Sequence, residues 1–104
     1  MALQAYSLAR DGSTALSPHF HVREFRCKDG SDPVFIDTEL VELLERIREH
    51  FGKPVVITSA YRTPVHNAKA GGAKFSQHLY GRAADIRVQG VSVEEQEPVD
   101  AVRG

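Results

Sequence analysis

The chain has 104 residues, which is enough for one compact domain built on a single modest hydrophobic core. Hydrophobic residues make up 41% of it and charged residues 26%, the proportions of an ordinary globular domain. A net charge of -1 excludes a broad basic field for nucleic acid or an anionic membrane, and no apolar run reaches the roughly 20 residues of a membrane helix.

The first residues lack a basic stretch followed by an apolar one, so we expect no signal peptide and a protein made in the cytoplasm. The single cysteine, Cys27, cannot form an internal disulfide and is expected to be a small core residue. With five histidines in the chain, a metal site is a natural candidate.

Residues 1–16 are predicted to be a weakly specified N-terminal arm that contains one turn. Ser17-Pro18 then suits the start of a helix, with serine as the cap and proline in the first turn. We expect the apolar side chains Phe20, Val22 and Phe25 to anchor this piece in the core. The residues from 28 to 33 are rich in turn formers and are predicted to be a loop.

The clearest helix is predicted from Asp37 to about Phe51, with Asp37 as its cap and Gly52 as its stop. Apolar residues recur there at three- and four-residue spacing and predict one buried stripe: Leu40, Leu43, Leu44, Ile47 and Phe51. The charged residues between them are expected to form a solvated face: Glu42, Glu45, Arg46 and Glu49.

Residues 55–58 are β-branched throughout and predict a short strand that is buried on both sides, because they show no polar alternation. This strand leads to Tyr61 and Arg62. Thr63-Pro64 then begins a helical turn that runs to about Lys69 and is closed by two glycines.

Residues 84–88 alternate apolar and polar side chains, as a strand with one polar face would. Ser92 with Glu95 matches a capping box, whereas residues 96–104 are predicted to be an irregular tail. This order of elements predicts an α+β fold in which a small antiparallel sheet is packed by helices. The corresponding organisation is an arm (1–16), a domain (17–95) and the tail.

Ten residues of the second half carry the strongest chemical signal. His78 stands seven positions before Asp85, and Gly81 between them permits a tight backbone path back toward the strand. Ala83 leaves room where a larger side chain would crowd the two. An imidazole nitrogen and a carboxylate oxygen that converge at the mouth of a strand are ligands for a borderline metal such as zinc.

This segment resembles the signature of the zinc D-alanyl-D-alanine carboxypeptidase and dipeptidase family of cell-wall peptidases. The matching positions are Ser76-x-His78-x-x-Gly81-x-Ala83-x-Asp85. Three further stretches also look like members of this family, especially those of phage lysis proteins: Phe20 to Phe25, Ser59 to Pro64 and Asn67 to Gly72. The resemblance covers roughly residues 17–95.

The resemblance implies a hedgehog/DD-peptidase-like fold and a zinc peptidase that acts on peptidoglycan peptides at the cell wall. His78 and Asp85 would be zinc ligands, and Arg62 would steady the substrate carboxylate or the developing oxyanion. Ser76 would support the ligands by a hydrogen bond, and Tyr61 would line the site. The structural alternatives are an arginine that only pairs with Asp85, a turn serine and a core tyrosine.

The family places a third ligand, a histidine, on a later strand, with a catalytic acid or base a few residues before it. No histidine follows His78 here, so the sequence resembles a family member that is C-terminally incomplete after about Glu95. His66 is the preferred substitute ligand, with a solvated helix histidine as its alternative. Other candidates are His19, His21 and the carboxylates of Glu94, Glu95 and Glu97. A second copy of the chain, paired at an open sheet edge, could also supply the ligand.

Three functional hypotheses follow. The first is an active zinc peptidase that cleaves peptidoglycan stem peptides by metal-activated attack of water. The second is a catalytically silent module of the same fold that binds metal or wall peptide. The third is a truncated product that self-associates through the open sheet edge. None of them involves nucleic acid or a membrane as a partner.

Overall fold

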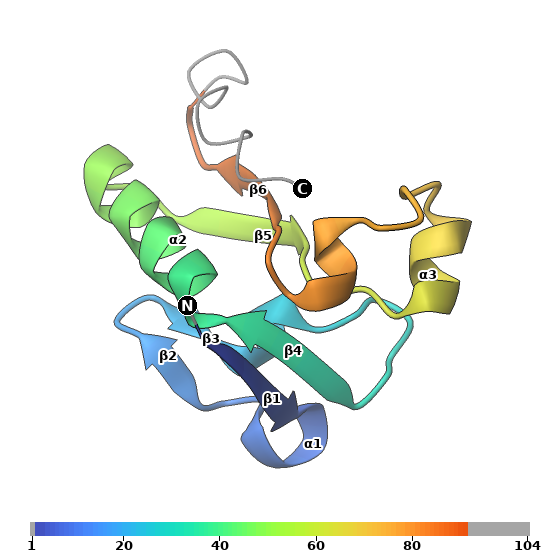
Figure 1. Ribbon diagram of the computed structural model, residues 1–104. Helices are drawn as coiled ribbons and strands as arrows, with labels where there is room; N and C mark the ends of the chain where they lie inside the picture. Colours follow the sequence, from blue (N-terminus) through green and yellow to red (C-terminus); the bar gives the residue numbers. More distant parts are fainter. Residues whose placement is uncertain (1, 92–104) are drawn as a thin grey trace.

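The computed structural model describes residues 2–91 and confirms an α+β fold with short antiparallel sheets (Figure 1). The elements in chain order are β1 (Leu3–Ser7), α1 (Leu8–Asp11), β2 (Ala15–Ser17), β3 (Phe20–His21), the 3-10 helix η1 (Val22–Phe25), β4 (Pro33–Asp37), α2 (Thr38–Phe51), β5 (Val55–Ser59), α3 (Pro64–Lys69), the 3-10 helix η2 (Gln77–Tyr80) and β6 (Asp85–Val88). The boundaries proposed for the domain and its tail stay predictions, since Ser92, Glu95 and residues 96–104 lie outside the described part of the chain.

Within residues 2–91 the strands form three two-stranded antiparallel sheets: β1 with β4, β2 with β3, and β5 with β6. The first of these pairs is a correction, because the sequence predicts a weakly specified arm over residues 1–16. β1 instead pairs along its whole length with β4, from Leu3 opposite Asp37 to Ser7 opposite Pro33. β1 forms because it pairs with a strand about 30 positions away, and the local sequence pattern of residues 3–7 does not predict that pairing.

The predicted helix start at Ser17-Pro18 is also wrong. Ser17 ends β2, and the chain turns back into β3 before η1 begins at Val22. The Ser17 hydroxyl and the His19 backbone N–H both donate to the Glu45 carboxylate of α2, and this long-range tie holds the turn in place of a helix. The predicted anchors of this piece are confirmed, because Phe20, Val22 and Phe25 are fully buried.

The helix α2 has the predicted ends. Asp37 caps it by accepting a hydrogen bond from the Glu39 N–H at 2.9 Å, and Gly52 ends it in the left-handed conformation. The predicted stripe is only partly right. Leu43 is 36% exposed, whereas Val41 and Glu45 are buried, so the buried face is rotated toward the side that covers β2 and β4.

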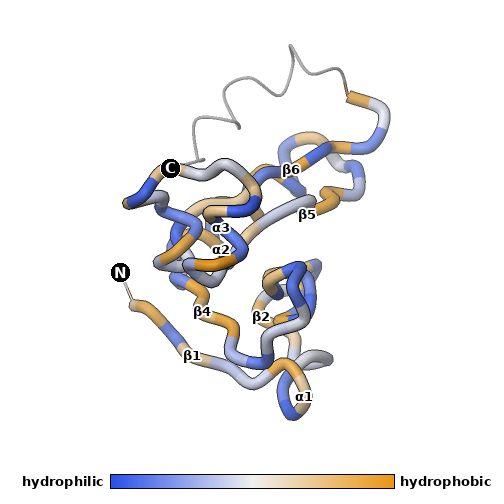
Figure 2. The backbone as a smooth tube through the Cα atoms, turned by 90° about the vertical axis from the view of Figure 1, so that its right-hand side faces the viewer, coloured by the Kyte–Doolittle hydropathy of each residue, from blue (hydrophilic) through white to orange (hydrophobic). Residues whose placement is uncertain are grey.

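The prediction that residues 55–58 are buried on both sides is wrong, because Val56 is 46% exposed. β5 pairs with β6, and the core covers one face of this pair, where Val55 and Ile57 are buried. β6 alternates as predicted, with Ile86 and Val88 buried, and the alternation is visible as changing colour along the tube in Figure 2.

One hydrophobic core unites these pieces. Its largest fully buried side chains come from η1, β4, α2 and their neighbours: Phe20, Phe25, Ile36, Leu44, Val22, Val34 and Cys27. Cys27 is therefore a core residue, as predicted. None of the helices within residues 2–91 combines the length and the apolar character needed to cross a membrane.

Candidate metal and substrate site

His78 lies on the short helix η2 and is only 4% exposed. Ser76 caps this helix, because its hydroxyl accepts a hydrogen bond from the His78 N–H at 3.2 Å. The imidazole Nδ1 lies 2.6 Å from the carbonyl oxygen of Ala60, which follows β5. A carbonyl can only accept, so Nδ1 carries the proton and the ring presents Nε2 on its other side.

Asp85 begins β6 and is paired in register with Ser59 of β5. Its Oδ2 lies 3.5 Å from His78 Nε2 and 3.4 Å from Arg62 Nη2. The three side chains predicted to form the site therefore meet at one carboxylate oxygen. Had His78 and Asp85 pointed to opposite sides of the molecule, the predicted metal site would have been excluded.

The loop between the two residues is fixed to β4. Gly81 has φ of 69°, and its carbonyl accepts a hydrogen bond from the Asp37 N–H at 2.9 Å. A Cβ at this position would overlap the Phe35 carbonyl oxygen, so glycine is required both by the backbone angle and by the close approach. Ala83, two residues later, is fully buried.

Arg62 is held by three hydrogen bonds to side chains. Its Nε donates to Ser59 Oγ at 3.0 Å, Nη1 to Asn67 Oδ1 at 3.2 Å and Nη2 to Asp85 Oδ2 at 3.4 Å. The side chain is 13% exposed. Pairing with Asp85, offered above as a structural alternative to substrate binding, is therefore present, and it directs the guanidinium toward His78.

Tyr61 belongs to the core. It is 7% exposed, and its ring packs edge-on against Phe35 with the ring centres 5.3 Å apart. Burial, with smaller contributions from Cys27 and Asp29, raises the pKa of the Tyr61 hydroxyl above its usual value. This environment matches the core alternative for Tyr61, and a contact with substrate stays a prediction.

His66 lies in α3, half-buried, and its backbone N–H donates to the capping Thr63 hydroxyl at 3.2 Å. Within residues 2–91, no three side chains of histidine, cysteine, aspartate or glutamate gather so that they could hold a metal ion. His66 therefore does not complete a ligand set with His78 and Asp85 in this arrangement. The carboxylates of Glu94, Glu95 and Glu97 lie outside the described range.

The other candidate histidines make contacts elsewhere. His19 Nδ1 lies 2.6 Å from Glu45 Oε2, next to α2. His21 contacts Glu24, which also accepts a hydrogen bond from the His21 backbone N–H.

The two donors at the site fit a metal in their chemistry and in their separation. Two ligands that each lie about 2.0–2.1 Å from a tetrahedral ion stand about 3.4 Å apart, close to the 3.5 Å between His78 Nε2 and Asp85 Oδ2. Catalytic zinc sites usually have three protein ligands, and within residues 2–91 no third histidine, cysteine, aspartate or glutamate joins this pair.

Sequence reasoning missed the groups that orient the site. The Ala60 carbonyl fixes the His78 ring, and the side chains of Ser59 and Asn67 fix Arg62. A backbone carbonyl leaves no mark in a sequence. Asn67 had one available signal, which is the glycine pair Gly71-Gly72 that follows it and allows a close approach of the backbone.

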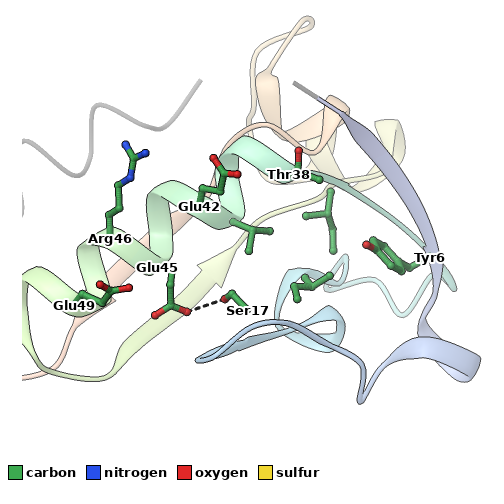
Figure 3. Close-up of a pocket in the computed structure, with 10 residues that line it drawn as sticks. Tyr6, Ser17, Thr38, Glu42, Glu45, Arg46 and Glu49 are labelled. Atoms are coloured by element: carbon green, nitrogen blue, oxygen red, sulfur yellow. Dashed lines mark hydrogen bonds between the residues drawn. The ribbon is translucent and has the colours of Figure 1, made fainter.

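A cavity of about 480 Å³ lies between α2 and the first two strands and shares no lining residue with the His78, Asp85 and Arg62 group. Figure 3 shows it, with the hydrogen bond from Ser17 to Glu45 at its wall. Its labelled lining residues are Tyr6, Ser17, Thr38, Glu42, Glu45, Arg46 and Glu49. The converging imidazole, carboxylate and guanidinium lie elsewhere, so this cavity is not part of the candidate site.

Comparison with protein families gave a match to the model described as Peptidase M15, over residues 18–100. The match contains all of the residues that converge at Asp85. Comparison with curated proteins and with solved structures gave no significant match.

Proposed function

The chain belongs to the peptidase M15 family, and from this membership we propose that it is a zinc-dependent peptidase of the D-alanyl-D-alanine carboxypeptidase type, with the stem peptides of peptidoglycan as substrate. The family makes it a protein of the peptidase type. The metal, the substrate and the roles of the individual residues are the proposal.

The observation that carries the proposal is the meeting of three side chains at Asp85 Oδ2. An imidazole with Nδ1 tied to a carbonyl, a carboxylate and an oriented guanidinium are the groups that a metallopeptidase needs on one side of a scissile bond. Arg62 and Asp85 alone would form an ordinary ion pair. The buried imidazole beside them favours a metal site.

In this proposal His78, through Nε2, and Asp85 hold the ion. Zinc bound there supplies a Lewis acid that polarises the peptide carbonyl and lowers the pKa of water. The Ala60 carbonyl keeps the His78 proton on Nδ1, so that the nitrogen facing the ion stays a ligand. Arg62 offers N–H groups to the substrate carboxylate or to the oxyanion, for which a planar guanidinium is well suited.

A second candidate is favoured by the ligand count. Because the described residues supply two donors, the same fold could bind metal or wall peptide weakly and catalyse nothing. The silent module and the enzyme would have the same contacts among His78, Asp85 and Arg62, and they would differ only in whether the bound peptide is cleaved.

The test measures two quantities on the purified chain: zinc retained after dialysis and D-alanine released from a pentapeptide that ends in D-alanyl-D-alanine. If the chain is an enzyme, we expect about one zinc retained per chain. We also expect the rate of D-alanine release to fall at least about 100-fold in His78→Ala and in Asp85→Asn. His50→Ala is the matched control, because His50 is an exposed histidine at the end of α2.

The outcomes separate the candidates. Zinc retention that depends on His78, without release of D-alanine, supports the silent module and contradicts the enzyme. Concentration-dependent assembly with little bound zinc contradicts both of them and supports the self-associating chain.

A further inference from the structure

Asn67 of α3 is a buried amide next to the candidate site. It is 3% exposed, and its side chain accepts one hydrogen bond and donates another. Oδ1 accepts from Arg62 Nη1 at 3.2 Å, and Nδ2 donates to the Ala73 carbonyl at 2.8 Å. The proposed function assigns this residue no role.

The orientation of the amide is fixed by chemistry. A guanidinium can only donate, and a carbonyl can only accept. If the amide were turned over, its NH₂ would face Arg62 and its oxygen would face the Ala73 carbonyl, so both bonds would be lost. Only one orientation therefore satisfies this buried side chain.

Gly72 holds the amide from the other side. A Cβ added there would overlap Asn67 Oδ1 and would lie 3.0 Å from Arg62 Nη1. The backbone N–H of Gly72 also donates to the Asn67 carbonyl at 2.8 Å. The loop after α3 thus packs directly against the contact between the amide and the guanidinium.

Arg62 has five N–H donors in one plane. Ser59 accepts from Nε, Asn67 from Nη1 and Asp85 from Nη2, so each of its three nitrogens is held by a different side chain. Three points fix both the position and the plane of the fork. Without Asn67, the guanidinium could rotate about its link to Ser59 and Asp85.

We propose that Asn67 is a positioning residue that fixes the plane of the Arg62 guanidinium, with Gly72 as the backbone support that makes the contact possible. Only one part of this inference rests on the proposed function, namely that the positioned Arg62 binds a carboxylate of the substrate. The geometric part can be measured without zinc and without turnover.

A purely structural role is the alternative, because the bond to Ala73 would by itself hold the loop after α3. Two substitutions separate these roles. Asn67→Asp keeps an oxygen that accepts from Arg62 but loses the donor to Ala73. Asn67→Ala loses both bonds.

The measurement is the side-chain ¹⁵N spectrum of Arg62 in the full chain. A fixed guanidinium has slow rotation about its Cζ–Nη bonds, so we expect separate Nη signals in the wild type and in Asn67→Asp and one averaged signal in Asn67→Ala. Val65→Ala is the matched control, since Val65 lies in the same helix and is 65% exposed. Separate signals that persist in Asn67→Ala would overturn the proposal.

If Asn67→Ala does not fold, Gly72→Ala replaces it. This variant keeps every polar partner and only displaces the amide, so it should also average the Nη signals, and unchanged signals would again contradict the inference.

The second readout is the affinity for N-acetyl-D-alanine, a carboxylate probe. We expect affinity to fall about tenfold in Asn67→Ala and to change less than about threefold in the control Val65→Ala. If the Nη signals average in Asn67→Ala but the wild type binds no probe, the role of Arg62 in the proposed function is contradicted while its positioning by Asn67 is supported.

Discussion

Gly81 shows how a single residue without a side chain fixes the candidate site. It lies between His78 and Asp85, in a left-handed conformation, and its backbone presses against β4 at Phe35. The imidazole and the carboxylate can meet only if the chain turns here. The residue acts through the backbone, in contrast to Asn67 and Ser59, which act through hydrogen bonds to Arg62.

We expect Gly81→Ala to destabilise the protein by about 3 kcal/mol. Roughly 1–2 kcal/mol comes from the left-handed backbone, and the remainder comes from the overlap with the Phe35 carbonyl oxygen. The measurement is urea unfolding at neutral pH. Gly52→Ala is the control, since Gly52 has φ of 61° and nothing within 4 Å of an added Cβ, so it should lose only the backbone part. Equal losses in the two variants would show that the contact with Phe35 carries no weight.

At the scale of elements, α2 organises the N-terminal half of the chain through Glu45. This carboxylate is 8% exposed and accepts hydrogen bonds from the Ser17 hydroxyl at 2.7 Å and the His19 N–H at 3.0 Å. Its other oxygen lies 2.6 Å from His19 Nδ1. The periodicity of α2 predicts a solvated Glu45, and only the turn between β2 and β3 explains why it is buried.

The environment of Glu45 predicts a pH-dependent stability. Burial by itself raises the pKa of the Glu45 carboxyl, but the hydrogen bonds from His19 and Ser17 outweigh it and hold the pKa below its ordinary value. A carboxyl with a lowered pKa in the folded state stabilises the fold above its unfolded pKa of about 4.3. This contribution is lost as the pH falls through the folded pKa.

Glu45→Gln should therefore cost about 1–3 kcal/mol at pH 7, and the difference from the wild type should shrink below about pH 4. The measurement is the free energy of unfolding in urea between pH 3 and pH 7. Glu42→Gln, on the exposed face of the same helix, should change it by less than about 0.5 kcal/mol. A Glu45→Gln deficit that stays constant down to pH 3 would contradict this account.

At the scale of the whole molecule, the three small sheets of the described part of the chain share one core, and the candidate site lies where the β5–β6 sheet meets β4 and α3. Arg62 follows β5, Asp85 begins β6, and His78 lies between them in η2, so segments separated by as many as 23 positions meet at one point (Figure 1). A metal ion held there would join η2 to the start of β6, and its binding energy would add to the stability of the fold.

Zinc is therefore expected to raise the melting temperature. At about ten times its dissociation constant, a ligand of the folded state adds about 1.4 kcal/mol, or roughly 6–11 °C for a domain of about 100 residues. The shift should appear in wild type and in His50→Ala and should be absent in His78→Ala, as measured by circular dichroism. An equal shift in His78→Ala would place the stabilising zinc elsewhere.

Much of the architecture was predictable because its signals are local. The caps at Asp37 and Gly52, the alternation of β6 and the burial of Phe20, Val22 and Phe25 follow from turn chemistry and from apolar spacing. The wrong predictions concern partners far apart in the chain. β1, the turn at Ser17 and the exposure of Val56 depend on which strand or helix lies opposite, and no local pattern contains that information.

The sequence alone nominated His78 and Asp85 as a pair of donors, and the resemblance of Ser76 to Asp85 to the family signature implied their role as zinc ligands. Residue type and backbone permissiveness are properties of single positions, so a sequence contains them. The 3.5 Å separation of the two donors, the carbonyl that sets the imidazole proton and the three supports of Arg62 were decided by the tertiary structure. The physical reason is that hydrogen-bond geometry depends on the relative placement of elements, which only the packing of the whole core determines.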